Sequence, residues 1–570
     1  MLTGAPAGPQ NAGVPPETAS SAETAESAET AAELFVRAAA REGIRDDVAA
    51  HFEDRSYSWR ELALESRRRA ALWAALRDPD APPHIGVLLD NTAEYLFWLG
   101  AAALTRSVIV GINATYRGAE LAQLVDYTDC QALVTSDTYA NLLADAPSHV
   151  HADRVLHTGS AQYAEQLDVV DPTTEHALAL PDDLYLLIFT SGSTGFPKAV
   201  RCTQGRFART GVHVKTVAEL GPGQAVYAPL PFFHSSSLFT GLASALQAGV
   251  PFATRSRFSA SNTMPDIRRV GATMLAYTGK VLNYILAVPP APDDATSPVT
   301  FAFGNEASED DIREFSRRFD CVVRDSYGST EGLVIIRRDA SMPSGALGTA
   351  DDTIRVFNPD TGTECPRAEF DAAGRLTNTE SAVGEIVNTA PGDTFEGYYR
   401  NEEANVSKVR DGIYWSGDLA YRDADGWFFF AGRSNEWLRV DGENFAAAPV
   451  ERIVLRAPGV RSAAVYAVPD DPVGDRVMVA VEVDDLTAFD LAAFDEFVQA
   501  QPDLGPKWVP SFVRVAPELP KLASMKIDKT RLRREGWDAP AVSWRPGRGD
   551  ELRPMTRADV TALEHLRKGA

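Results

Sequence analysis

The chain has 570 residues, of which 45% are hydrophobic and 24% are charged. This length exceeds what one hydrophobic core usually organises, so the sequence predicts a globular protein of two or more domains. The formal net charge of −24 argues against a general nucleic-acid or anionic-membrane partner, because such binding draws on a broad basic surface. Any anionic ligand must therefore bind at a local basic site.

The first segment, residues 1–30, is rich in Ala, Glu, Thr, Ser and Pro and holds almost no large apolar side chain. Such a composition cannot bury enough surface to offset the entropy lost on ordering, so we expect a disordered tail. The start of the chain lacks a basic region followed by an apolar run, so the sequence gives no indication of a signal or transit peptide. The apolar run at residues 95–104 is too short to span a bilayer and predicts a core helix. We therefore expect a cytosolic protein without a transmembrane segment.

The four cysteines and nine histidines show no spacing typical of a metal site. Neither a C-x-x-C pair nor an H-E-x-x-H motif is present. We expect buried thiols, with no disulfide framework and no transition metal held by the protein.

From residue 34 onward, apolar residues recur alternately at helical and strand periods, which predicts an α/β fold with mostly parallel sheet. The most specific pattern is a loop that follows a buried-type strand at residues 185–189. Its small residues let backbone N–H groups approach phosphate oxygens, its hydroxyls add donors and its lysine adds charge. The spacing differs from the G-x-x-x-x-G-K-[ST] loop of common NTPases. We predict a phosphate-binding site at Thr190, Ser191, Gly192, Ser193, Thr194, Gly195 and Lys198.

A β-hairpin near residue 425 marks the end of the large domain. Residues 420–422 and 427–430 favour strands, and Asp425-Gly426 favours a tight turn with positive φ. A polar segment that begins with glycine follows at residues 432–435, and then a smaller α+β-like pattern. We expect a tail at 1–30, a large domain at 31–432, a small C-terminal domain at 433–540 and an extension at 541–570.

The loop at 190–198 resembles the T-S-G-S-T-G-x-P-K signature of the adenylate-forming superfamily, which includes acyl-CoA synthetases, adenylation domains and luciferases. P-L-P-F-F-H at 229–234, Y-G-S-T-E at 327–331 and Y-W-S-G-D at 414–418 resemble further motifs of this family, in the same order. The resemblance covers nearly the whole chain. It implies an α/β fold with a large domain of stacked sheets and a small β-barrel, followed by a small mobile α+β domain.

The resemblance also implies which residues bind ATP and Mg²⁺. In the family, the tyrosine of the Y-G-x-T-E motif stacks on adenine, the threonine contacts the α-phosphate and the glutamate holds magnesium. The aspartate of the Y-x-T/S-G-D motif accepts hydrogen bonds from both ribose hydroxyls, a task that suits a group with acceptors only. Besides the loop, the implied nucleotide-binding residues are Gly304, Asn305, Glu306, Tyr327, Gly328, Thr330, Asp418, Arg433 and Lys526, with Glu331 as the metal ligand.

Some of these assignments leave alternatives open. Residues 304–306 fit a plain strand-end turn as well, and a lone histidine such as His234 is often structural. Lys526 aligns with the family's essential lysine, but Lys521 and Lys529 are nearby competitors. The implied catalytic residues are Lys526, Glu331, Thr194 and His234, the last near the substrate carboxylate.

Within the superfamily, R-V-D-G-E-N-F at 439–445, N-T-A-E-Y at 91–95 and N-A-T-Y-R-G at 113–118 are most similar to very-long-chain acyl-CoA synthetases and fatty-acid-transport-protein-like ligases. The implied reaction activates a carboxylic acid as an acyl-adenylate with release of pyrophosphate, then transfers the acyl group to coenzyme A. It also implies that the small domain rotates between the two steps about a hinge at Asn435.

Three alternatives to this reaction remain. The acceptor could be a carrier protein or an amine, or the acid could be small or inorganic, such as nitrite. A lipid-binding or scaffold protein that has lost the reaction is the alternative from another class, and the reactive types of the motif residues argue against it.

Overall fold

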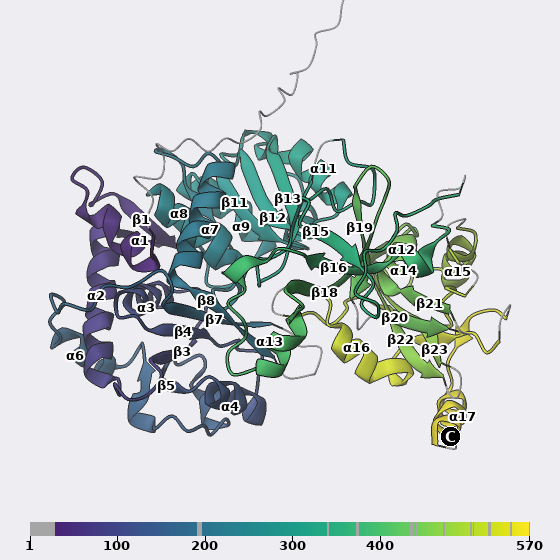
Figure 1. Cartoon of the computed structure of the whole chain (residues 1–570), viewed down its shortest axis with the longest axis horizontal. Helices are drawn as coiled ribbons and strands as arrows, with labels where there is room; N and C mark the ends of the chain where they lie inside the picture. The colour runs from purple at the N-terminus through teal and green to yellow at the C-terminus, as the bar shows by residue number, and fades with distance from the viewer. Residues whose placement is uncertain are drawn as a thin grey trace, which may run out of the picture.

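The computed structural model describes residues 29–190, 197–338, 341–371, 376–433, 437–440, 443–470, 474–501, 504–505, 507–522, 526–547 and 550–568. Almost all of the predicted N-terminal tail lies outside these residues. The first helix begins with a capping box, in which the Thr30 hydroxyl accepts from the Glu33 backbone N–H and the Glu33 carboxylate accepts from the Thr30 N–H. Figure 1 shows α2 and α6 at one end of the molecule and the C-terminal elements at the other.

One sheet of the large domain has six strands in the order β6-β5-β3-β4-β7-β8. All neighbours are parallel except β7 and β8, and every residue of β3, β4 and β5 is buried, as expected for a parallel sheet covered on both faces. The strands are β3 His84–Leu88, β4 Val108–Gly111, β5 Cys130–Thr135, β6 Val155–His157, β7 Leu184–Thr190 and β8 Lys198–Thr203.

The second sheet has eight strands in the order β14-β13-β12-β11-β9-β10-β1-β2, parallel from β13 to β1 and antiparallel at both edges. Residues of both sheets and of the helices α1, α2, α3 and α7 share one core, so the sheets are stacked. The strands are β1 Val48–Phe52, β2 Arg55–Ser58, β9 Val226–Tyr227, β10 Phe252–Thr254, β11 Met274–Thr278, β12 Phe301–Asn305, β13 Val322–Gly328 and β14 Ile335–Arg337.

The helices of these two layers include the predicted core helix at residues 95–104, which is confirmed as α3 and is almost entirely buried. The four cysteines are free and buried, also as predicted. In the part of the chain that the structure covers, no helix has both the length and the apolar character needed to cross a membrane. The helices are α1 Ala31–Arg37, α2 Trp59–Leu76, α3 Ala93–Leu104, α4 Gly118–Tyr127, α5 Ala140–Ala144, α6 Ala161–Asp168, α7 Gln204–Val217, the π-helix η4 Ser236–Ala243, α8 Ser244–Ala248, α9 Ala260–Val270, α10 Val281–Leu286 and α11 Glu309–Phe319.

A third, antiparallel sheet follows, in the order β15-β16-β18-β17, with β19 paired to β18. The predicted hairpin is present as β18 and β19, and Gly426 has a φ of 94°. Its connection spans residues 423–427 instead of a two-residue turn, because the Asp423 carboxylate accepts from the Trp427 N–H and closes a longer loop. The elements are β15 Ile354–Phe357, α12 Thr379–Ala382, β16 Gly384–Asn388, α13 Glu402–Lys408, β17 Val409–Arg410, β18 Ile413–Arg422 and β19 Phe428–Arg433.

The C-terminal part forms a two-stranded sheet, β20-β21, and a five-stranded sheet in the order β22-β23-β24-β25-β26. Residues after 541, which the sequence suggests form an extension, supply β25, and this strand pairs with β24. Val542 and Leu563 belong to the same core as residues of β22 and β24. The elements are β20 Trp437–Val440, β21 Glu443–Ala446, α14 Ala447–Val454, β22 Val460–Asp470, β23 Gly474–Val483, α15 Leu491–Gln499, β24 Phe512–Ala516, α16 Lys529–Glu535, β25 Val542–Trp544, β26 Arg553–Pro554 and α17 Arg557–Lys568.

Candidate active site

The carboxyl ends of three neighbouring parallel strands bring the predicted site residues together. Thr278 at the end of β11 pairs with Asn305 at the end of β12, and Asn305 pairs with Ser326 of β13. Tyr327 and Gly328 continue β13, so they lie beside the 304–306 segment. Ligands of open α/β sheets usually bind at this edge, where the strands end.

The predicted phosphate loop is described only at its two ends. Thr190 ends β7, Lys198 begins β8, and the two residues are paired in register. Ser191, Gly192, Ser193, Thr194 and Gly195 lie outside the described residues. The Lys198 Nζ lies 5.3 Å from the centre of the Tyr398 ring.

Glu331 is joined to this lysine-bearing strand end through Tyr398. The Tyr398 hydroxyl donates to its Oε1 at 2.7 Å. Burial would raise the pKa of Glu331, but the Lys408 ammonium and the Tyr398 hydroxyl outweigh burial and hold this pKa below its ordinary value. Glu331 is therefore an ionised acceptor in a largely desolvated setting.

Two buried hydroxyls beside Glu331 make no hydrogen bond of ordinary geometry within the described part of the chain, although the Ser329 hydroxyl lies close enough to act on the pKa of both Glu331 and Tyr414. They are the Ser329 Oγ and the Tyr414 Oη. The Asn305 Oδ1, at the end of β12, is also buried without a hydrogen-bond partner among the described residues. Because buried polar atoms are nearly always paired in folded proteins, these three atoms mark places where a polar ligand or water completes the site.

Asp418 lies in β18, where it is buried and accepts a hydrogen bond from the Tyr327 hydroxyl. This contact joins the Y-G-S-T-E and Y-W-S-G-D motifs, which are 91 residues apart. Arg433 is the residue paired with Asp418 across the β18–β19 ladder. The Arg433 side chain lies outside what the structure describes.

The 304–306 segment has a tight backbone. A Cβ placed on Gly304 would lie 2.3 Å from the Tyr277 carbonyl oxygen, which explains why glycine stands here. Glu306 adopts a left-handed conformation with φ of 65°, so the chain turns sharply at the end of β12. This turn directs the Glu306 side chain toward the C-terminal domain.

Replacing Gly304 by alanine should therefore destabilise the protein, because the backbone of β11 would have to move. We expect a loss of about 1–3 kcal/mol, the usual cost of overpacking a core. Urea unfolding of Gly304→Ala measures it. The matched control is Gly221→Ala, because a Cβ at Gly221 meets no atom within 4 Å. Equal unfolding midpoints for the two variants would contradict this account.

His234 lies close enough to Lys526 to feel the charge of that lysine. Its Nε2 is buried and lacks a hydrogen-bond partner within the described part of the chain. Burial, together with the positive charge of Lys526, lowers the pKa of His234 to about 4. His234 is thus neutral at ordinary pH and presents one free ring nitrogen to the site.

Lys526 reaches across from the C-terminal domain. Its Nζ lies 2.6 Å from the Glu306 Oε1, and both side chains stay accessible to solvent. An ion pair that is accessible to solvent contributes little to the stability of the protein. Its effect here is to hold the Lys526 ammonium at the site. The competitors bind elsewhere: Lys529 pairs with Glu451 at 2.9 Å and Lys521 with Glu482 at 3.3 Å, both within the C-terminal domain.

Sequence reasoning missed two residues that complete this site, Tyr398 and Lys408. Tyr398 is placed by a bridge to Val200 of β8, and Lys408 ends the short helix α13. Neither belongs to a motif that the sequence singled out. Only Tyr398 carries a local signal, because in Gly397-Tyr398-Tyr399 two large aromatic residues follow a glycine.

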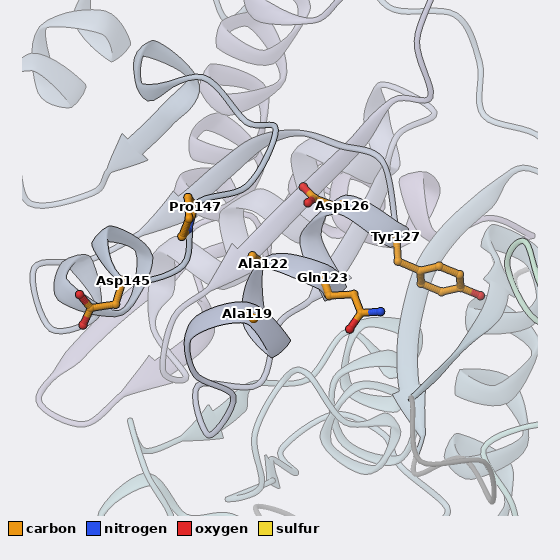
Figure 2. A pocket seen from close by; sticks show the side chains of 7 residues that line it. All are labelled: Ala119, Ala122, Gln123, Asp126, Tyr127, Asp145 and Pro147. Carbon is orange, nitrogen blue, oxygen red and sulfur yellow. The ribbon is translucent and has the colours of Figure 1, made fainter.

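A separate hollow of about 560 Å³ lies on the surface of α4 (Figure 2). Tyr127, at one side of it, donates its hydroxyl proton to the Tyr399 carbonyl oxygen. None of the residues that the motifs single out lines it. The lining residues are Ala119, Ala122, Gln123, Asp126, Tyr127, Asp145 and Pro147.

Comparison with known proteins identifies the class to which this fold and site belong. The model of the AMP-binding enzyme family matches residues 35–399, and that of the AMP-binding enzyme C-terminal domain matches residues 449–526. The chain belongs to the AMP-binding enzyme family. Solved structures with a similar fold include ATP-bound MatB from Rhodopseudomonas palustris, with a TM-score of 0.75 and 22% identity over 88% of this chain and 98% of that chain.

Curated relatives narrow the class further. Steroid-22-oyl-CoA synthetase of Rhodococcus jostii is 43% identical over 91% of this chain and 94% of the relative. Medium/long-chain-fatty-acid–CoA ligase FadD17 of Mycobacterium marinum is 42% identical over 87% and 95%. The chain is an acid–CoA ligase: it activates an acid with ATP, with release of pyrophosphate, and transfers the acyl group to coenzyme A. The reaction uses ATP, Mg²⁺ and coenzyme A.

The residues present fit a magnesium–nucleotide complex. In the described part of the chain, no three His, Cys, Asp or Glu side chains group so that they could hold a metal without help. Mg²⁺ is commonly held by one or two carboxylates together with substrate phosphates, and Glu331 supplies one ionised carboxylate with the Ser329 hydroxyl beside it.

Proposed function

We propose that the acid substrate is a large hydrophobic carboxylic acid, either a medium- or long-chain fatty acid or the side-chain acid of a steroid. The observation that carries this proposal is the identity of 42–43% with ligases named for these two kinds of acid, over nearly the whole length of both chains. The motifs in the sequence alone leave the acid open, because the shape of the acid pocket depends on how side chains pack.

We assign the site residues as follows. The loop at 190–198, including Thr194, binds the phosphates, Tyr327, Gly328 and the 304–306 segment face adenine, and Thr330 faces the α-phosphate. Asp418, assisted by Arg433, binds the ribose. Glu331 holds Mg²⁺, which when bound neutralises charge on the phosphates. His234 and Lys526 lie where the acid's carboxylate meets the α-phosphorus.

In the first step these residues act by positioning and charge. His234, neutral because of its low pKa, can donate one ring N–H to an oxygen of the entering carboxylate without binding it as a counter-ion. Lys526 stabilises the negative charge that gathers as the carboxylate oxygen attacks the α-phosphorus and pyrophosphate departs. In the second step the thiol of coenzyme A attacks the acyl carbonyl and AMP leaves, which requires no covalent bond to the protein.

We propose that the large domain ends near residue 432 and that the small domain rotates about a hinge at Asn435 between the steps. Asn435 lies outside the described residues, so the support is the ion pair of Lys526 with Glu306, which requires the two domains to be closed on each other. The cytosolic location expected from the sequence stays a prediction.

A panel of acids tests the substrate proposal. Pyrophosphate release is measured with and without coenzyme A for nitrite, short aryl acids, fatty acids of increasing chain length and steroid side-chain acids. We expect kcat/KM to rise with hydrophobic size and to be highest for a long fatty acid or a steroid acid. A short or inorganic acid as the best substrate would overturn the proposal.

A further inference from the structure

Asp418 lies in an irregular part of β18. The ladder between β16 and β18 shifts register between the pairs Glu385–Leu419 and Val387–Trp415, so residues 416–418 bulge away from β16. Gly417 within the bulge has a φ of 84°, a conformation that favours glycine. A bulge re-aims a side chain but leaves backbone groups without ladder partners, and these need other partners.

Two side chains hold the backbone of the bulge. The Lys408 ammonium donates to the Ser416 carbonyl oxygen, and the Glu385 Oε1 accepts from the Gly417 N–H at 2.5 Å. Both contacts fall on the two residues immediately before Asp418. They satisfy the backbone groups that the bulge frees, and they fix the turn from which the Asp418 carboxylate projects.

The local sequence explains how Lys408 reaches this place. Lys408 ends α13, and β17 follows at once and pairs with β18 through a turn at Asp411 and Gly412, both with positive φ. Val409 is paired with Tyr414, so the preceding residue lies beside the start of the bulge. Figure 1 shows α13 next to β18.

The surroundings of the Lys408 ammonium are unusual for a partly buried lysine. Among the described residues, no carboxylate oxygen lies within 4.0 Å of the Lys408 Nζ, which is the distance that defines an ion pair. The charges of Glu331, Glu385 and Asp418 nevertheless act on it, and burial lowers the pKa of Lys408 against their effect. A partly buried lysine that donates to one carbonyl oxygen and is acted on by the charges of three carboxylates suits a structural role in the nucleotide site.

We propose that Lys408 and Glu385 are positioning residues that aim the Asp418 carboxylate at the ribose of ATP. The proposal rests on the proposed role of Asp418. It adds a requirement that the known motifs do not contain, namely that ribose recognition depends on a lysine ten residues before the aspartate.

Nucleotide discrimination tests the proposal. We compare kcat/KM for ATP and for 2′,3′-dideoxy-ATP in pyrophosphate release, because only ATP has the hydroxyls that Asp418 would bind. The wild type should prefer ATP, and Lys408→Met should reduce this preference about tenfold, the scale of a charge-assisted hydrogen bond. Lys408→Arg should restore part of it. Lys215→Met is the matched control, since Lys215 is likewise in the last turn of a helix, and should keep the wild-type preference.

A second variant and a double variant separate the outcomes. Glu385→Met removes the other hold on the bulge and should act like Lys408→Met, so the test does not depend on one variant folding. Lys408→Met combined with Asp418→Asn should lose no more preference than Asp418→Asn alone. If Asp418→Asn retains the preference, the ribose role of Asp418 fails and the proposal with it. If Asp418→Asn loses the preference while folded Lys408→Met and Glu385→Met keep it, only the positioning role is overturned.

Discussion

Lys526→Ala should abolish most pyrophosphate release while leaving thioester formation from a prepared acyl-adenylate nearly intact. The Nζ of this lysine is held at the site by its contact with Glu306 across the domain interface. A charged contact made in the transition state is typically worth about 3 kcal/mol or more, so we expect a loss of at least about 100-fold in the first step. Thiol attack on the adenylate needs no such charge at the phosphates.

Both half-reactions are measured on the same preparation. Lys529→Ala is the control, because the Lys529 Nζ pairs with Glu451 within the C-terminal domain and lies in the same segment. Comparable losses in the two half-reactions of Lys526→Ala would contradict the division of labour. An unaffected first step would point instead to Lys521, whose Nζ also faces the large domain, 5.1 Å from the centre of the Tyr284 ring.

Much of the fold follows from local patterns in the sequence. Two segments are continuous runs of apolar residues, namely the buried strand at 185–189 and the run before Gly304. Such runs are typical of strands in a parallel sheet that is covered on both faces. Because such strands end at a common edge, motifs that follow them converge without any further information. For this reason the 304–306 and 327–331 segments are expected to lie side by side, and the parallel pairing of β12 with β13 places them so.

What the sequence left out depends on contacts between distant segments. The hydrogen bond from Tyr398 to Glu331 joins residues 67 positions apart, and nothing in the spacing of the motifs predicts it. Lys408 reads as an ordinary basic residue in the last turn of a helix, where it would favour the helix dipole. Its role becomes visible only when the bulge in β18 is known. The sequence suggests an extension after residue 541, because β25 and β26, with three and two residues, are too short to show a period.

Glu331→Gln should lower kcat for pyrophosphate release by about 100-fold, the scale of losing one preorganised electrostatic contact. The amide keeps an acceptor for the Tyr398 hydroxyl, so the local packing survives and the change is confined to charge. Without the carboxylate, Mg²⁺ is held less tightly together with the phosphates. Raising the magnesium concentration should therefore restore part of the activity, and a magnesium titration of kcat measures this.

Asp418→Ala provides the contrast, because the proposed assignment gives its carboxylate to the ribose and not to the metal. Loss of the ribose contacts should raise the KM for ATP about tenfold, the scale of a hydrogen bond to a charged group. It should change kcat much less, since the ribose is bound equally in the ground state and the transition state. Added magnesium should not compensate, because no metal ligand has been removed. If both variants lost kcat equally and neither responded to magnesium, the assignment of Glu331 to the metal and of Asp418 to the ribose would be wrong.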